Sequence, residues 1–203
     1  MTINKKIPLA LSTGALTLAL VLTGCTDTAI APSDTSSSPS ASTSAAAFTE
    51  ADGMFVTMMI PHHEQAIEMS DILLAKDGAD PRVVELAEQI KAAQGPEIDK
   101  MLGWLEDWGV EYDPESTSGM DHGSMGDDSM MSEEDMAMLE DADAIEASRL
   151  FLQQMIVHHD GAVDMASTAL EDAQNPDVLA LAQQVIDDQT AEISTMQDLL
   201  GEL

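Results

Sequence analysis

The sequence is poor in cysteine, aromatic residues and basic residues. The shortages of cysteine and of basic residues exclude several kinds of site and partner. Its one cysteine, Cys25, excludes an internal disulfide and a cluster of thiolate ligands. Seven Lys and Arg stand against 38 Asp and Glu, which gives a formal net charge of −31. Because such a chain repels phosphate, we expect no nucleic-acid partner. The acidic surface either gathers cations or is only a solvated face.

Long apolar runs are absent except at the amino terminus. Lys5 and Lys6 precede an apolar run over 7–22, which is typical of an export signal. The run ends at Leu22-Thr23-Gly24-Cys25, which looks like a lipobox, where a cysteine is acylated and becomes the new amino terminus. We therefore predict a lipoprotein signal peptide over 1–24 and a lipid on Cys25, which anchors the protein to the outer face of the bacterial cell membrane and is its only membrane contact. Cleavage there leaves five basic and 38 acidic residues, a formal charge of −33.

The composition divides the rest of the chain into a tether and a folded domain. Residues 25–47 consist mostly of Ser, Thr, Ala and Pro with almost no large apolar side chain, which predicts a disordered tether. Residues 48–203 predict one helical bundle domain. It comprises a first repeat over 48–109, an acidic Met/His loop over 111–131 and a second repeat over 132–203.

Apolar residues in this domain recur every three or four positions, and no stretch alternates like a strand. Helix starts are marked by Thr49 with Asp52, by Ser132, and by the pairs Asp80-Pro81 and Asn175-Pro176. The pattern predicts an all-α fold with helices over 49–76, 81–108, 133–141, 144–173 and 176–200. Short turns join the long helices in pairs, so we expect two antiparallel hairpins that form a four-helix bundle, with a short helix between the halves.

The two hairpins are copies of one another in sequence. Residues 55–69 align with 151–165 at an offset of 96, and the offset after the turn is 95. Each copy carries the motif Met-x-x-His-His-x-x-Ala-x-x-Met, which runs from Met59 to Met69 and from Met155 to Met165. The repetition predicts two related sites.

Histidine and methionine gather on one face in each copy. At roughly 100° per residue, Met59, His62 and His63 fall on the side that faces the bundle interior, as do their counterparts. Four of the five histidines belong to these two pairs. Histidines that are merely buried and methionines that only fill a core are the alternative. The predicted metal ligands are Met59, His62, His63, Met69, Met101, Met155, His158, His159, Met165 and Met196.

The partner helices supply polar residues at the same level as the histidines. Counting outward from the turns puts Gln94 and Glu97 beside the first pair, and Gln189 beside the second with Glu192 one turn further along. Both glutamates lie on an apolar face, where a carboxylate without a partner is unfavourable. We expect these four residues either to bind a metal or to support a histidine ligand by a hydrogen bond.

This set of residues favours copper. Thioether sulfur is soft and imidazole is intermediate, so the combination suits Cu(I), with Ag(I) as a mimic, better than Mg²⁺ or Ca²⁺, while Zn²⁺ normally recruits cysteine or more carboxylates. The Glu-x-x-His pattern of di-iron bundles is absent, and so is the His-Glu-x-x-His motif of zinc proteases. The sequence shows no Gly-rich phosphate loop and no activated nucleophile. We therefore expect a binding protein rather than an enzyme.

A second methionine cluster lies in the loop between the hairpins. It comprises Met120, His122, Met125, Met130 and Met131. Because the segment has no helical periodicity, we expect these methionines to be exposed to water. We interpret the cluster as an accessory loop that captures a cation, and an acidic linker with incidental methionines is the alternative.

At these motifs the chain resembles the family catalogued as domain of unknown function 305, exported bacterial proteins with a ferritin-like helical bundle. The resemblance covers residues 48–201 and implies a four-helix bundle and, in some members, an association with copper handling. The copies differ where Pro61 stands opposite Val157. Because proline removes a helical hydrogen bond and frees the carbonyl of Thr57, we predict a kink in the first helix and two sites of different geometry.

Three functional hypotheses follow from the sequence. The leading one is an extracytoplasmic lipoprotein that binds and buffers copper, Cu(I) above all but also Cu(II), for copper tolerance or for transfer to a partner protein. The second is a structural or signalling bundle without metal, in which the histidines act as a pH latch. The third is a redox enzyme that uses bound copper. A homo-oligomer with hairpins exchanged between chains also stays open.

Overall fold

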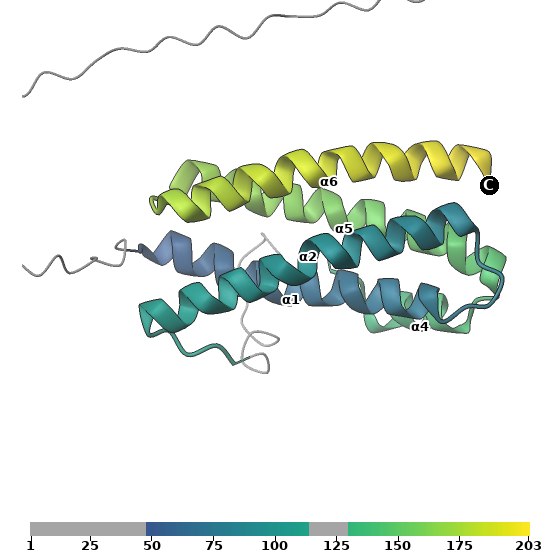
Figure 1. Ribbon diagram of the computed structural model, residues 1–203, viewed down its shortest axis with the longest axis horizontal. Helices are drawn as coiled ribbons and strands as arrows, with labels where there is room; N and C mark the ends of the chain where they lie inside the picture. The colour runs from purple at the N-terminus through teal and green to yellow at the C-terminus, as the bar shows by residue number, and fades with distance from the viewer. Residues whose placement is uncertain (1–47, 114–129) are drawn as a thin grey trace, which may run out of the picture. The chain divides into compact units, whose positions relative to one another are not determined.

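The computed structural model describes residues 48–113 and 130–203, and in these ranges the chain forms five helices and no strand (Figure 1). They are α1 (Glu50–Leu74), α2 (Pro81–Trp108), α4 (Glu133–Asp141), α5 (Ala144–Asp172) and α6 (Pro176–Glu202). The all-α prediction is confirmed, and each predicted helix ends within two residues of its observed bounds. The signal peptide, Cys25 and the tether lie outside the described residues, as do Met120, His122 and Met125 of the loop.

The helices begin at the capping residues that the sequence contains. The Thr49 side chain accepts a hydrogen bond from the Asp52 amide, and the Asp52 carboxylate accepts from the Thr49 amide at 2.6 Å. A second capping box opens α4. Asp80 and Asn175 cap α2 and α6, each followed by proline. Such caps bind amide groups that have no partner inside the helix, so the helix starts are determined locally.

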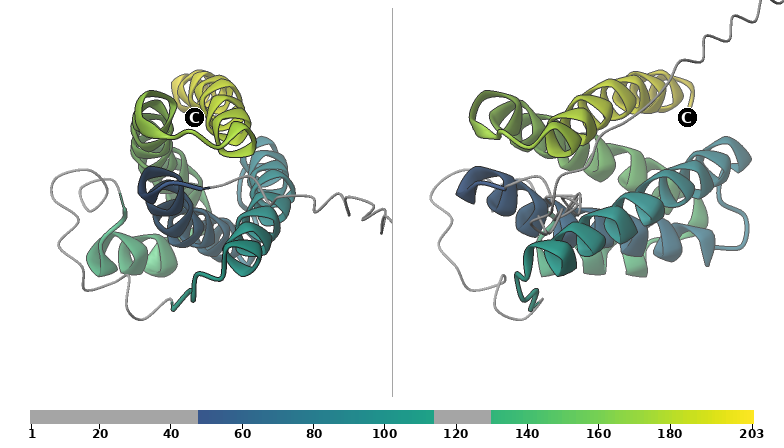
Figure 2. Two further views of the ribbon diagram at one scale, coloured as in Figure 1. Left: turned by 90° about the vertical axis from the view of Figure 1, so that its left-hand side faces the viewer. Right: turned by 60° about the vertical axis from the view of Figure 1, so that its left-hand side comes forward.

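The four long helices pack as two hairpins that share one interface. α1 packs against α2, α5 packs against α6, and the hairpins meet mainly where α1 packs against α5. Figure 2 shows the four helices around a common centre, with α4 outside it against α1 and α5. None of the described helices is long and apolar enough to span a bilayer. The ferritin-like relationship and the domain boundaries stay predictions.

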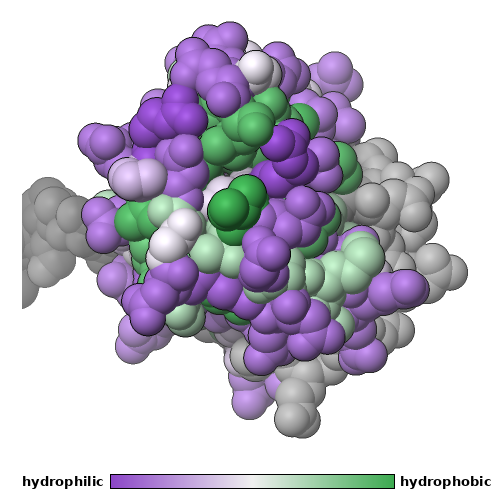
Figure 3. All heavy atoms as spheres, turned by 90° about the vertical axis from the view of Figure 1, so that its right-hand side faces the viewer, coloured by the Kyte–Doolittle hydropathy of each residue, from purple (hydrophilic) through white to green (hydrophobic). Residues whose placement is uncertain are grey.

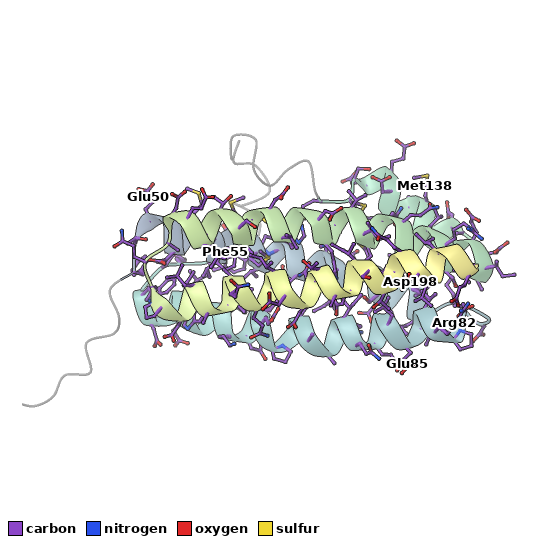
Figure 4. All side chains as sticks on the ribbon, turned by 90° about the horizontal axis from the view of Figure 1, so that it is seen from above. Glu50, Phe55, Arg82, Glu85, Met138 and Asp198 are labelled. Carbon is purple, nitrogen blue, oxygen red and sulfur yellow. The ribbon has the colours of Figure 1, made fainter. Side chains whose placement is uncertain are left out.

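The side chains that point between the helices form the core. Phe55 lies between the helices in Figure 4, whereas Glu85 and Asp198 lie on the outer faces. The end face in Figure 3 is largely hydrophilic with scattered apolar side chains. Pro61 lies inside α1, and the helix continues past it. The predicted kink at this residue stays a prediction.

Each hairpin holds the turn of the other hairpin. The Asp52 carboxylate on α1 accepts hydrogen bonds from the amides of Gln174 and Asn175, at 3.0 and 2.9 Å, in the turn between α5 and α6. Ser148, which occupies the same place on α5, accepts from the amide of Asp80 at 3.0 Å in the turn between α1 and α2. Equivalent contacts, one from each copy, therefore join the two hairpins.

Candidate metal centre

The four paired histidines are buried at the centre of the bundle and form one layer. His62 is 1% exposed and His63, His158 and His159 are 0% exposed. The rings of His62 on α1 and His158 on α5 lie with their centroids 3.7 Å apart and their planes at 36°. The sequence predicted one pair in each copy, and the packing of α1 against α5 brings the two pairs together. We call these four residues the histidine layer.

A glutamate from the partner helix contacts one histidine of each pair. His63 Nε2 lies 2.8 Å from Glu97 Oε2, and His159 Nε2 lies 2.6 Å from Glu192 Oε2. Glu97 thus lies beside His63 as counting from the turn predicts, whereas Glu192, which the count put one turn further along, contacts His159 directly. An ionised carboxylate only accepts hydrogen bonds, so we assign the hydrogen to Nε2 in both rings. In the neutral ring the lone pair then lies on Nδ1, and both Nδ1 atoms are buried with no hydrogen-bond partner in the described residues.

The two glutamates differ in their surroundings. Gln184 on α6 donates from Nε2 to Glu97 Oε1 at 2.8 Å, across the boundary between the hairpins. Gln89 aligns with Gln184 in the other copy, but it bonds to Glu85 on its own helix. The Glu97 side chain is 9% exposed and that of Glu192 is 21% exposed. The sequence analysis missed Gln184, although the repeated glutamine was a signal that could have found it.

Burial keeps two histidines of the layer neutral. Desolvation, with a smaller contribution from His63 and His159, lowers the pKa of His62 to about 3. The same cause lowers the pKa of His158 well below its ordinary value of 6.5. A neutral imidazole with an available lone pair is the form that binds a metal.

Methionines lie in the core on both sides of the histidine layer, in two groups that each combine the two copies. One hydrophobic cluster contains Met59 and Met101 of the first copy with Met165 of the second. The other contains Met69 of the first copy with Met155 and Met196 of the second. All six are fully buried except Met165, which is 7% exposed. Met101 joins Met59 as counting from the turn predicts, whereas Met165 and Met69 each join the opposite copy because α1 and α5 are antiparallel.

The sequence model of the family described as domain of unknown function (DUF305) matches residues 52–200. The chain belongs to this family. Two solved structures of DUF305 proteins are similar to it. A fragment from Deinococcus radiodurans is 32% identical, with a TM-score of 0.65 over 77% of this chain and 99% of that one. A putative secreted protein from Streptomyces coelicolor is 33% identical, with a TM-score of 0.67 over 75% of this chain and 91% of that one.

A third similar structure is that of CopM in its Cu(I)-bound form, which is 30% identical and covers 74% of this chain and 96% of that one with a TM-score of 0.61. CopM is also solved in Cu(II)-bound and Ag-bound forms. No curated protein matches the chain. The similarity thus connects this DUF305 protein to structures that hold copper or silver.

The described residues of this chain bring few nitrogen and oxygen ligands together. Over 48–113 and 130–203, no three side chains of His, Cys, Asp and Glu form a group that could hold a metal ion. A metal in the histidine layer therefore needs sulfur from the methionine groups, or rings that rotate. Gln94 and Gln189 are each 3% exposed, and the side-chain oxygen of each has no hydrogen-bond partner in these ranges.

The part of the predicted capture loop that is described differs from the prediction. Met130 and Met131 were expected to be exposed, but both are partly buried. The Gln65 side chain binds the main chain of Met131 through two hydrogen bonds. This contact comes from α1, 66 residues earlier, so no local pattern in the loop could have predicted it.

Proposed function

We propose that this DUF305 protein is an extracytoplasmic copper-binding protein that buffers copper, Cu(I) in preference, and has no enzymatic activity. One observation carries the proposal. His63 and His159 each bind a carboxylate through Nε2 and leave a buried Nδ1 without a hydrogen-bond partner in the described chain, between two groups of buried methionines. The copper-bound and silver-bound forms of CopM support a soft metal as the ligand.

The donor set fits a copper cargo. The Nδ1 atoms of His63 and His159 supply imidazole, and the methionine groups supply thioether sulfur, which Cu(I) prefers to carboxylate. Glu97 and Glu192 orient the two rings, as carboxylates behind metal-bound histidines do. Gln94 and Gln189 add amide oxygens to the same layer.

We further propose that the protein is exported and held at the membrane by a lipid on Cys25. The lipobox that ends in Cys25 supports this location, and the similar Streptomyces coelicolor protein is described as secreted. Copper taken up outside the cytoplasm is then buffered or passed to another exported protein. Mass spectrometry of protein from the native membrane tests the anchor, because acylation adds a fixed mass at the new amino terminus.

A competition titration tests the copper proposal. The mature protein should remove Cu(I) from a coloured chelator, and the variant with alanine at His62, His63, His158 and His159 should lose this ability. Because that variant leaves cavities, a second one replaces Met59, Met101, Met155 and Met196 by leucine, which conserves core volume. Met54→Leu, at a 51% exposed position, is the matched control. Equal affinity in all variants would overturn the proposal.

The pH-latch alternative requires histidines that gain charge near neutral pH. The pKa of His62, lowered by burial to about 3, lies far from that range. Thermal melts of metal-free protein at several values between about pH 5 and 8 separate the two ideas. A latch predicts a large change in melting temperature there, and a copper site does not.

A further inference from the structure

The interface between α1 and α5 is covered on its outer side by α4. This short helix packs against α1 and α5 (Figure 2). His62 contacts His158 in the same α1–α5 interface. Since the histidine layer is at most 1% exposed, a cation from solvent needs a route to it. The segment that leads into α4 is held against α1 by Gln65.

Gln65 binds the main chain of Met131, two residues before the start of α4. Gln65 Oε1 accepts from the Met131 amide at 2.7 Å, and Gln65 Nε2 donates to the Met131 carbonyl at 2.9 Å. Gln65 follows His62 by three residues, so it lies roughly 4.5 Å further along the helix axis. The aligned residue in the second copy is Gly161, so the duplicated fold itself does not require this contact. The contact therefore holds the Met131 main chain at the level of Gln65, about one helical turn from His62.

The Met131 side chain lies at the surface of the core cluster that contains buried methionines. It is partly buried and packs against the cluster that contains Met69 and Met155. Leucine would fill this place equally well, so packing alone does not call for sulfur. A thioether here is partly exposed and packs against the cluster that contains Met69 and Met155.

A buried polar atom without a hydrogen-bond partner in the described residues lies near the same interface. Gln154 on α5 donates from Nε2 to the carbonyl of Asp135 on α4 at 2.9 Å. Gln154 Oε1 is buried and has no hydrogen-bond partner among residues 48–113 and 130–203, and His158 follows one turn later on α5. Buried polar atoms are normally bonded, so this oxygen points to a ligand or to passing water.

We propose that Met131 is the entry ligand of the protein, which takes up Cu(I) at the α1–α5 interface and passes it to the histidine layer. This inference rests on the proposed function. The step is a ligand exchange in which one Cu–S bond breaks as one Cu–N bond forms, and no electron is transferred. Gln65 is a positioning residue that holds the Met131 main chain in place.

The test compares the rate of uptake with the final affinity. Cu(I) is presented to the mature protein as its complex with a coloured chelator, and the loss of colour is followed by stopped flow. Met131→Leu should slow uptake about tenfold, which is about 1.4 kcal/mol in the barrier. The equilibrium affinity should stay unchanged because the buried ligands are intact. Gln65→Leu should slow uptake in the same direction.

Met138→Leu is the matched control, since Met138 lies on α4 at 45% exposure. Uptake at the wild-type rate in Met131→Leu would overturn the inference and leave the proposed function in place. A fall in equilibrium affinity equal to the fall in rate would also overturn it, because Met131 would then belong to the final site. Failure of the wild-type protein to bind Cu(I) would remove the proposed function itself.

Discussion

At the scale of single residues, the centre of this protein depends on which ring nitrogen is free. Glu97 and Glu192 each bind Nε2 of a histidine, and the opposite nitrogen is left buried. A hydrogen bond between residues 34 positions apart thus places the hydrogen of the His63 ring on Nε2 and the lone pair on Nδ1. Counting from the turn placed Glu97 correctly, because residues that are equally far from a short turn lie at the same level on the two helices.

The first prediction concerns Glu97. Glu97→Gln weakens the support of His63, so the affinity for Cu(I) should fall about 10–100-fold, as for other carboxylates behind metal ligands. The competition titration measures this change. Glu85→Gln, on the exposed face of the same helix, is the control and should match wild type. If the two variants bind alike, Glu97 has no part in metal binding.

At the scale of the helices, Asp52 connects the start of α1 to the turn of the other hairpin. Burial acts to raise its pKa, but hydrogen bonds from Thr49, Asn175 and Gln174 outweigh burial and hold the pKa below its ordinary value of 3.8. The folded state therefore favours the ionised carboxylate more than the unfolded state does. Its contribution to stability is complete above pH 3.8 and is lost as the pH falls through the lowered pKa.

The second prediction follows from the lowered pKa of Asp52. Asp52→Asn should reduce the free energy of unfolding by about 1.5–3 kcal/mol at pH 7, because hydrogen bonds to a charged group are lost. Urea unfolding at neutral pH and below pH 3.8 measures the difference, which should shrink in acid. Ser148→Ala removes the equivalent uncharged contact and should cost about 1 kcal/mol at either pH. A constant difference for Asp52→Asn would contradict the charge argument.

The third prediction concerns the difference between the copies at Pro61 and Val157. Pro61→Val restores a helical hydrogen bond and should raise the stability of the protein, by up to roughly 3 kcal/mol. The reciprocal change, Val157→Pro, should lower it by roughly 3 kcal/mol or more. Val157 is 51% exposed, so its loss leaves no cavity. Urea unfolding of both variants checks the pair, and equal stability would show that α1 has fully adapted to proline.

At the scale of the whole molecule, the two motifs are one centre rather than two independent sites. His62 and His158 touch, and each methionine group draws from both copies. A single hairpin would hold half of the histidine layer and part of each methionine group. Metal binding should therefore depend on the two hairpins being packed together.

The fourth prediction is that the two copies are coupled in copper binding. His62→Ala and His158→Ala should each reduce the affinity for Cu(I), and the double variant should lose less than the sum of the two, by about 0.5–3 kcal/mol. Competition titrations of the four proteins complete the cycle. His62→Ala combined with Met138→Leu is the control and should be additive. Additive losses in the histidine cycle would show two independent sites.

The sequence by itself determined the helices and the faces that they bury. Caps at Thr49, Asp80 and Asn175, and the spacing of the apolar residues, act within a few residues of one another, so they can be read without a fold. The duplication and the short turns also determined which residues of a hairpin lie level. Met101 beside Met59 and Glu97 beside His63 follow from these alone.

Only the tertiary structure decided how the two hairpins meet. The contact between His62 and His158, the hydrogen bond from Gln184 to Glu97 and the hold of Gln65 on Met131 all join segments that no turn connects. The physical reason is that periodicity shows which face of a helix is apolar, but not which other face it packs against. The packing of α1 against α5 joins the two motifs in one histidine layer.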